Sequence, residues 1–218
     1  MNGNGWLTVI TGPMFSGKST ELVREINRHI FAHEPYVAFK PDIDNRYAED
    51  FIVTHPTPNN DGIMKLPAFS IPVNDSCRGI ILEKSADARV IGFDEVQFWN
   101  PSVKLPELIR DLVEKKDKIV YATTLNMSYE GKGFKSAVNL VLYANEIRLL
   151  TSVCAKCGNK AIYSQRVDPS GNPVFRGELI QVGNNYQARC GKCFEREEVS
   201  GLIRTAEPDL VRQKLTSR

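Results

Sequence analysis

A loop near the start of the chain has the residue types and the spacing needed to bind phosphate. It runs Gly12-Pro13-Met14-Phe15-Ser16-Gly17-Lys18-Ser19 and fits G-x-x-x-x-G-K-[ST] at every fixed position. Glycines in such a loop allow backbone N–H groups to point at phosphate oxygens. We expect Lys18 to reach the β- and γ-phosphates of a nucleoside triphosphate, and the Ser19 hydroxyl to bind magnesium. The loop thus predicts triphosphate binding, but it does not indicate which molecule would accept a phosphate.

Two adjacent acids follow an apolar run in the middle of the chain. Asp94 and Glu95 come directly after Val90-Ile91-Gly92-Phe93. In phosphate-loop proteins an Asp at the carboxyl end of a neighbouring strand holds the magnesium, and we expect Asp94 to do so. Glu95 would face the same crevice as a general base that accepts the proton of an attacking hydroxyl. ATPases use the same pair of acids, and there Glu95 would activate water instead.

Four of the five cysteines are spaced as metal ligands. Cys154 and Cys157 form one C-x-x-C pair, and Cys190 and Cys193 form another after residues 158–189. Four thiolates suit a tetrahedral structural zinc ion with no open position for catalysis. The interval between the pairs exceeds that of the commonest double-knuckle pattern, so a loop must extend from the site. The fifth cysteine, Cys77, is expected to be a buried or indifferent thiol.

The elements that would position these residues alternate in type up to residue 152. Helices are predicted over residues 20–33, 79–84, 105–116 and 136–144, from apolar residues at three- and four-residue spacing. Strands are predicted over residues 7–10, 37–39, 90–93, 118–122 and 146–152. This order predicts an α/β fold like that of P-loop NTPases, with a mainly parallel sheet and helices on both faces. Residues 40–75 are expected to be irregular, because prolines, a glycine and several Asn and Asp interrupt any period.

The chain is therefore predicted to have three parts. Residues 1–152 would form an ATP-binding α/β domain, and residues 153–195 a small zinc-binding domain that carries a lasso-like loop. Residues 196–218 are charged and are expected to be a C-terminal tail.

Composition argues against several other classes of protein. The formal net charge is +2, from 28 Lys and Arg against 26 Asp and Glu, which is too near neutral for a nucleic-acid or membrane surface. The sequence has no apolar run of the roughly 20 residues that span a bilayer, and its polar start lacks a signal pattern. A cytoplasmic location is expected. A DNA-dependent ATPase with a zinc ribbon would need a basic stripe and a longer core. A regulatory module without catalysis would not need both acids.

Together these motifs resemble the type II thymidine kinase family, the zinc-containing kind, over roughly residues 5–195. Besides the phosphate loop with Thr20 and the cysteines, the resemblance rests on Asp44-Asn45-Arg46-Tyr47, Phe93-Asp94-Glu95-Val96-Gln97-Phe98, Phe134 with Asn139-Leu140, and Tyr186. It implies magnesium-dependent transfer of the γ-phosphate of ATP to the 5′-hydroxyl of thymidine or deoxyuridine. With thymidine the product is dTMP, for salvage of DNA precursors.

The resemblance also implies roles for single residues. Glu95 would be the base, while Lys18 and Arg46 would stabilise phosphate charge. ATP and its magnesium would be bound by the loop from Gly12 to Thr20, by Asp94 and by Gln97. The nucleoside pocket would be lined by Met14, Asp44, Phe98, Leu125, Tyr129, Phe134, Ser164 and Tyr186. Residues 167–186, here called the lasso segment, would fold over the thymine. The family is usually homotetrameric and is inhibited by thymidine triphosphate (dTTP).

Four features depart from the family pattern, all of them around the base. Thr124-Leu125-Asn126 stands where Gly-Leu-Asp is usual, and Tyr129 replaces a Phe. Ser164 replaces a Thr that is expected to face the methyl group of thymine. Residues 182–185 form a shorter stretch than usual. These differences leave the phosphate site intact and bear on which base is preferred.

Overall fold

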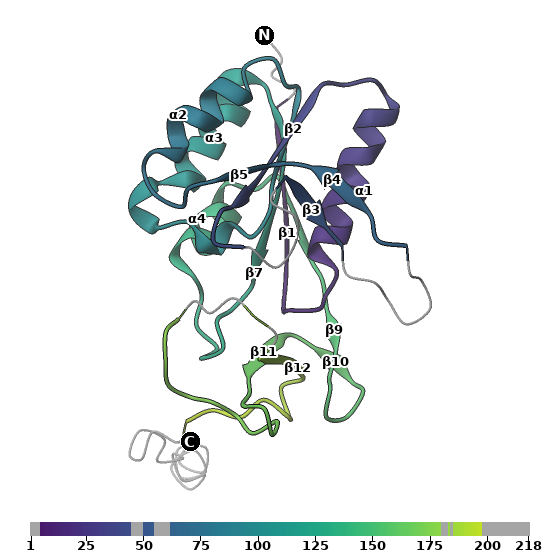
Figure 1. Ribbon diagram of the computed structural model, residues 1–218, viewed down its shortest axis with the longest axis vertical. Helices are drawn as coiled ribbons and strands as arrows, with labels where there is room; N and C mark the ends of the chain where they lie inside the picture. Colours follow the sequence, from purple (N-terminus) through teal and green to yellow (C-terminus); the bar gives the residue numbers. More distant parts are fainter. Residues whose placement is uncertain (1–4, 45–49, 55–61, 180–182, 184, 198–218) are drawn as a thin grey trace, which may run out of the picture.

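A parallel sheet forms the centre of the molecule (Figure 1). The computed structural model describes residues 5–44, 50–54, 62–179, 183 and 185–197. The sheet has six strands in the order β5-β2-β6-β7-β1-β8, and every pairing is parallel. Its strands are β1 (Trp6–Gly12), β2 (Tyr36–Pro41), β5 (Phe69–Ile71), β6 (Val90–Phe93), β7 (Ile119–Leu125) and β8 (Glu146–Leu149). The predicted α/β class is confirmed.

Helices cover both faces of this sheet, as predicted (Figure 1). On one face lies α1 (Lys18–Phe31), and on the other lie α2 (Cys77–Lys84), α3 (Leu105–Lys116) and α4 (Lys135–Tyr143). Each face has its own apolar core. The apolar residues of α1 recur every three or four positions, so one stripe of the helix is buried against the strands. Short 3-10 helices, η1 (Val96–Phe98) and η2 (Pro101–Val103), connect β6 to α3.

The expectation that residues 40–75 are irregular is wrong in part. This region contributes β5 to the central sheet and the antiparallel pair β3 (Phe51–Val53) and β4 (Lys65–Pro67). Each strand has three residues, which is too short to produce a recognisable period. Tertiary contacts form them instead, because Ile52 and Leu66 are buried in the same core as α1.

A smaller unit follows the sheet and carries the cysteines; we call residues 152–197 the cysteine-bearing unit. It contains the antiparallel pairs β9 (Ser152–Val153) with β10 (Lys160–Ala161), and β11 (Tyr163–Arg166) with β12 (Tyr186–Arg189). The single strand predicted over residues 146–152 is wrong, since Leu150 and Thr151 separate β8 from β9. Figure 1 shows this unit at the end of the sheet where β1 and β7 end.

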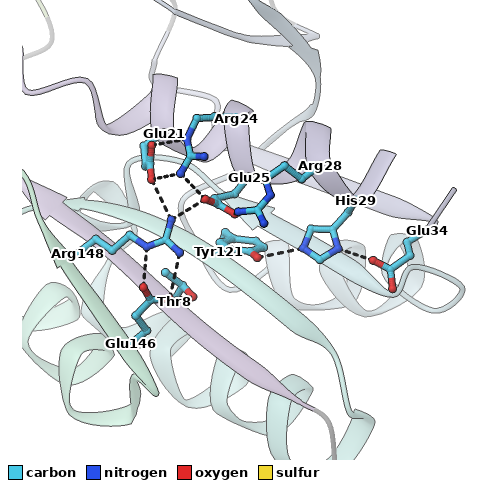
Figure 2. A network of polar contacts seen from close by, with 10 residues as sticks. All are labelled: Thr8, Glu21, Arg24, Glu25, Arg28, His29, Glu34, Tyr121, Glu146 and Arg148. Carbon is cyan, nitrogen blue, oxygen red and sulfur yellow. Dashed lines mark hydrogen bonds and ion pairs between the residues drawn. The ribbon is translucent and has the colours of Figure 1, made fainter. Parts of the chain in front are cut away.

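Charged side chains join α1 to the far edge of the sheet (Figure 2). Arg148 on β8 donates to Glu25 on α1 at 2.7 Å and to Glu21 at 2.9 Å. It also donates to Glu146 on its own strand at 2.8 Å. Glu25 is only 2% exposed, so its carboxylate depends on the charges of Arg148, Arg24 and Arg28 for compensation.

The same layer continues along α1. His29 shares hydrogen bonds with the Tyr121 hydroxyl on β7, at 3.0 Å, and with Glu34 just beyond the helix (Figure 2). These contacts fix the helix that begins at the phosphate loop. Within the described residues, no helix combines the length and the apolar character that crossing a bilayer requires.

Candidate functional site

The phosphate loop connects the end of β1 to the first turn of α1. Gly17 has φ of 82° and ends the loop in a left-handed conformation that favours glycine. At Gly12 a Cβ atom would lie 2.6 Å from the Leu150 carbonyl oxygen, so a larger residue would not fit. Lys18 is buried, and its Nζ donates to the Pro13 carbonyl at 2.8 Å. The loop therefore presents backbone N–H groups, a helix N-terminus and one lysine, which suits a phosphate chain.

Ser19 and Asp94 meet beside this loop. The Ser19 hydroxyl lies 3.1 Å from both carboxylate oxygens of Asp94. Burial and, to a smaller extent, the charge of Glu95 raise the pKa of Asp94 to about 6. A divalent cation would favour the ionised carboxylate and reverse this effect. The hydroxyl and carboxylate oxygens are the hard donors that magnesium prefers, so this pair fits the ion that the loop motif implies.

Thr123, at the end of β7, joins the two acids. Its hydroxyl donates to Asp94 at 2.5 Å and accepts the Glu95 N–H at 2.9 Å. Glu95 has φ of 56°, a left-handed conformation that is strained for a residue with a side chain. Its carboxylate accepts a hydrogen bond from Gln97, whose amide oxygen accepts the Leu125 N–H at 3.0 Å. Both the backbone and the carboxylate of Glu95 are thus held by β7.

Four of the residues expected around a nucleoside form two pairs. Met14 and Ser164 meet directly, because the Met14 N–H donates to the buried Ser164 hydroxyl at 2.9 Å. Tyr129 and Tyr186 are both close to the Arg166 side chain, with ring centroids 3.8 and 5.5 Å from the centre of its guanidinium. The Ser164 oxygen therefore serves the phosphate loop, a role that the sequence did not indicate.

The other expected residues lie on elements near the carboxyl ends of the strands. Asp44 is buried after β2, near enough to Asp94 for its charge to raise the pKa of that carboxyl. Leu125 ends β7 and Phe98 ends η1, while Phe134 is buried directly before α4. Arg46 lies outside the described residues.

Two contributors, Thr123 and Arg166, were missed from the sequence, and a third, Asn126, was noted only as a departure from the family pattern. Asn126 donates from its side-chain amide to the Ile162 carbonyl at 2.8 Å and so ties β7 to the cysteine-bearing unit. An aspartate, the usual residue there, has no such donor at neutral pH. For Thr123 a signal did exist, since polar residues at a buried strand end beside a phosphate loop face the site.

The four paired cysteines come together as predicted. Their sulfur atoms all lie within 4.8 Å of one another, and the Cys157 and Cys190 sulfurs are 3.6 Å apart. A tetrahedral zinc with Zn–S bonds of about 2.3 Å would separate the sulfurs by about 3.8 Å, so the cluster fits that ion.

The protonation of the thiols points the same way. Burial opposes ionisation of Cys154, but hydrogen bonds from backbone N–H groups outweigh it and lower its pKa to about 6. Hydrogen bonding to Cys157 instead raises the pKa of Cys193 to about 12. Thiols this close cannot all ionise by themselves, and a cation such as zinc would stabilise four thiolates.

Comparisons with known proteins agree with the resemblance seen in the sequence. A family model described as "Thymidine kinase" matches residues 5–194. The chain is 40% identical over 197 residues to a thymidine kinase of Thermococcus kodakarensis, covering 87% of this chain and 94% of that protein. It is 36% identical over 202 residues to a thymidine kinase of Mesoplasma florum, covering 89% and 93%. A solved structure of the flagellar accessory protein FlaH from Methanocaldococcus jannaschii matches 72% of this chain and 75% of its own. Its TM-score of 0.44 and identity of 14% are too low to carry an argument.

Proposed function

This chain belongs to the thymidine kinase family, and we propose that it transfers the γ-phosphate of ATP to the 5′-hydroxyl of thymidine, and also of deoxyuridine. The observation that carries the proposed chemistry is the fixed Glu95 carboxylate beside the Ser19–Asp94 pair. A phosphate loop accounts only for the triphosphate. A carboxylate held next to the magnesium-binding pair accounts for activation of a hydroxyl.

The phosphate chain of ATP would lie in the loop from Gly12 to Thr20. Backbone N–H groups and the start of α1 would donate to its oxygens, and Lys18 would balance the charge of the β- and γ-phosphates. Magnesium, held by Ser19 and Asp94 with Gln97 nearby, would neutralise charge on the transferring phosphate. We assign Arg46 the same electrostatic task at the γ-phosphate, on the resemblance of its sequence box alone.

In the proposed reaction the nucleoside 5′-oxygen attacks the γ-phosphorus. An O–P bond forms as the bond from phosphorus to the β,γ-bridging oxygen breaks, and ADP leaves with that electron pair. The hydroxyl proton passes to the carboxylate of Glu95. An unassisted alcohol is a poor nucleophile, so the positioned base supports a gain of about 10²- to 10⁴-fold.

We propose that Met14, Asp44, Phe98, Leu125, Tyr129, Phe134, Ser164 and Tyr186 surround the nucleoside. The lasso segment would lie over its base, and zinc on the four cysteines would anchor both ends of that segment. The contacts of Tyr129 with Gly177 and of Met14 with Ser164 support this arrangement, since they connect the sheet and the phosphate loop to the cysteine-bearing unit.

We also propose how the protein is regulated and assembled. dTTP would inhibit, because its base suits the nucleoside pocket and its phosphates suit the loop. We propose a homotetramer because β8 is the last strand of the sheet and apolar side chains of β8 and α4 are exposed: Val138, Leu142, Ile147 and Leu149. Paired cysteines without disulfides fit a reducing compartment, so we propose the cytoplasm.

A nucleoside panel tests the proposed function. The protein is incubated with γ-labelled ATP, magnesium and single nucleosides, and the products are separated. We expect labelled dTMP from thymidine and labelled dUMP from deoxyuridine, with little product from cytidine or purine nucleosides. Hydrolysis of ATP without a labelled nucleotide, especially if DNA stimulates it, would contradict the proposal.

A further inference from the structure

Arg166, at the end of β11, is a buried cation that the proposed mechanism does not use. It is 3% exposed. Its Nη2 donates to the Glu178 carbonyl at 2.7 Å and to the Tyr186 hydroxyl at 2.8 Å, and its Nε lies 3.3 Å from the same hydroxyl. A buried guanidinium that gives several N–H groups to neutral oxygens organises the groups around it, because each bond fixes a direction.

One flat face of this guanidinium is also in contact. Its centre lies 3.8 Å from the Tyr129 ring centroid, well within cation–π range, whereas the Tyr186 ring, 5.5 Å away, meets the edge of the group through its hydroxyl. Tyr129 follows β7, and Tyr186 begins β12. One side chain therefore joins three parts of the chain: the loop after β7, the start of β12, and the lasso segment at Glu178.

The Tyr129 hydroxyl makes a second attachment to the lasso segment. It donates to the Gly177 carbonyl at 3.1 Å, adjacent to the carbonyl that Arg166 binds. A phenylalanine at this position would keep the ring contact with Arg166 but could not donate this hydrogen bond. The tyrosine thus adds an attachment that this chain gains from its departure at position 129.

We infer that Arg166 is a positioning residue for the nucleoside base. It orients the rings of Tyr129 and Tyr186 and holds the lasso backbone at Gly177–Glu178, so that the wall over the base is formed before the nucleoside binds. Its Nε and Nη2 donors are engaged with protein oxygens, so through them it acts on these neighbours. A lysine could not replace it, because an ammonium group has neither the planar faces nor the fork of N–H groups. This inference rests on the proposed function of the same site.

The kinetic test compares Arg166→Met with Arg28→Met as a control. Arg28 is an arginine near the end of α1, outside the phosphate loop and the cysteine-bearing unit, and its side chain is 67% exposed and pairs with Glu25. For Arg166→Met we expect the thymidine KM to rise about tenfold or more, as for loss of charge-assisted hydrogen bonds. The KM for ATP should change by less than about twofold, and the control should retain both constants.

Tyr129→Phe provides the second variant, in case Arg166→Met fails to fold, as judged by lost zinc and a lowered Tm. Loss of one neutral hydrogen bond should raise the thymidine KM about two- to tenfold, with the ATP constant unchanged. An unchanged thymidine KM in the folded variants overturns the inference. So does an equal rise in both KM values, because that indicates general damage.

A readout independent of activity is tryptic cleavage after Arg176, the one Lys or Arg between residues 167 and 188 of the sequence. We expect faster cleavage in Arg166→Met than in the unaltered chain, because the lasso segment is less firmly held. Equal rates overturn the inference. If the unaltered protein phosphorylates no nucleoside, the proposed function fails, and the cleavage rates still decide whether Arg166 holds the segment.

Discussion

The Thr123 hydroxyl has one oxygen for two tasks. By accepting the Glu95 N–H and donating to Asp94, it fixes the direction of both hydrogen bonds. The first hydrogen bond helps to keep Glu95 in its left-handed conformation. In the second, Asp94 accepts, as an ionised carboxylate does. A single buried hydroxyl thus sets the spacing between the proposed base and the proposed magnesium ligand.

Glu95→Gln tests the base directly. The amide is nearly isosteric and cannot accept the proton, so we expect kcat to fall about 10²- to 10⁴-fold. The Kd for ATP, measured by calorimetry, should stay the same because Lys18 and the loop are untouched. Glu83→Gln, at a side chain 72% exposed on α2, is the matched control and should retain full turnover. Retained turnover in Glu95→Gln would show that another group takes the proton.

Most residues of the candidate site that have local motifs were predictable. The phosphate loop, Asp94 and the four cysteines have spacings that impose their chemistry within a few positions. Thr123 and Arg166 were not found, because their partners lie 28 and 20 residues away in the sequence. The position of Thr123 near the end of a buried strand was a signal that could have been used, whereas an arginine beside a glutamine looks ordinary until folding brings its partners to it.

The helix that begins at the phosphate loop is held at its middle as well as at its start. Leu22, Val23 and Ile26 bury one stripe, and Arg148 binds the carboxylates of Glu21 and Glu25 beside it. The apolar stripe stabilises packing of the helix against the sheet but does not fix the position of the helix along the sheet. The ion pairs to Arg148 of β8 define where the helix lies on the sheet, and hence where its N-terminus meets the loop.

Arg148→Met should therefore destabilise the fold. It leaves the buried Glu25 with fewer partners, and we expect the free energy of unfolding to fall by about 1–3 kcal/mol, measured by urea denaturation. Lys115→Met, at an exposed pair with Asp111 on α3, should cost less than about 0.5 kcal/mol. Equal losses in the two variants would refute a special role for Arg148.

The same variant has a pH signature. Hydrogen bonds from Arg24 and Arg148 hold the pKa of Glu21 below its usual 4.5, and Arg148 lowers that of Glu146. Carboxylates with a lowered pKa in the folded state stabilise it above pH 4.5, and this stabilisation is lost as pH falls below that value. The difference in stability between the unaltered chain and Arg148→Met should therefore shrink in acid.

Long helices and buried strands were predicted to within a few residues, whereas β3, β4 and β5 were not. In α3 the repeat of apolar residues over twelve positions outweighs local noise. A strand of three residues between prolines has no repeat to read, and β5 exists because β2 offers it a parallel edge. Such strands depend on tertiary context, so sequence periodicity could not reveal them.

The two parts of the molecule are stabilised in different ways. The apolar cores on both faces of the sheet are built from residues 7–150, whereas the small core of the cysteine-bearing unit contains Cys154, Ala161, Ala188 and Cys190. The sheet can therefore be stabilised by hydrophobic burial, whereas we propose that the smaller unit, with its small apolar core, depends on zinc for its stability.

Removal of zinc should therefore affect the two parts of the molecule differently. After chelation we expect the far-ultraviolet circular dichroism of the sheet and helices to persist, while thymidine binding, followed by calorimetry, is lost. Cys190→Ser should behave like the chelated protein, and Cys77→Ala, at the cysteine outside the cluster, should keep both zinc and binding. Cooperative loss of all secondary structure on chelation would contradict this division.

Two serines connect the cysteine-bearing unit to the phosphate loop: Ser164 accepts the Met14 N–H, and Ser152 donates to the Phe15 carbonyl at 3.1 Å. The unit proposed to bind the nucleoside and the loop proposed to bind ATP are thus joined directly by hydrogen bonds. Reciprocal linkage follows. Whatever factor ATP adds to the affinity for thymidine, thymidine must add to the affinity for ATP, whichever of the two binds first.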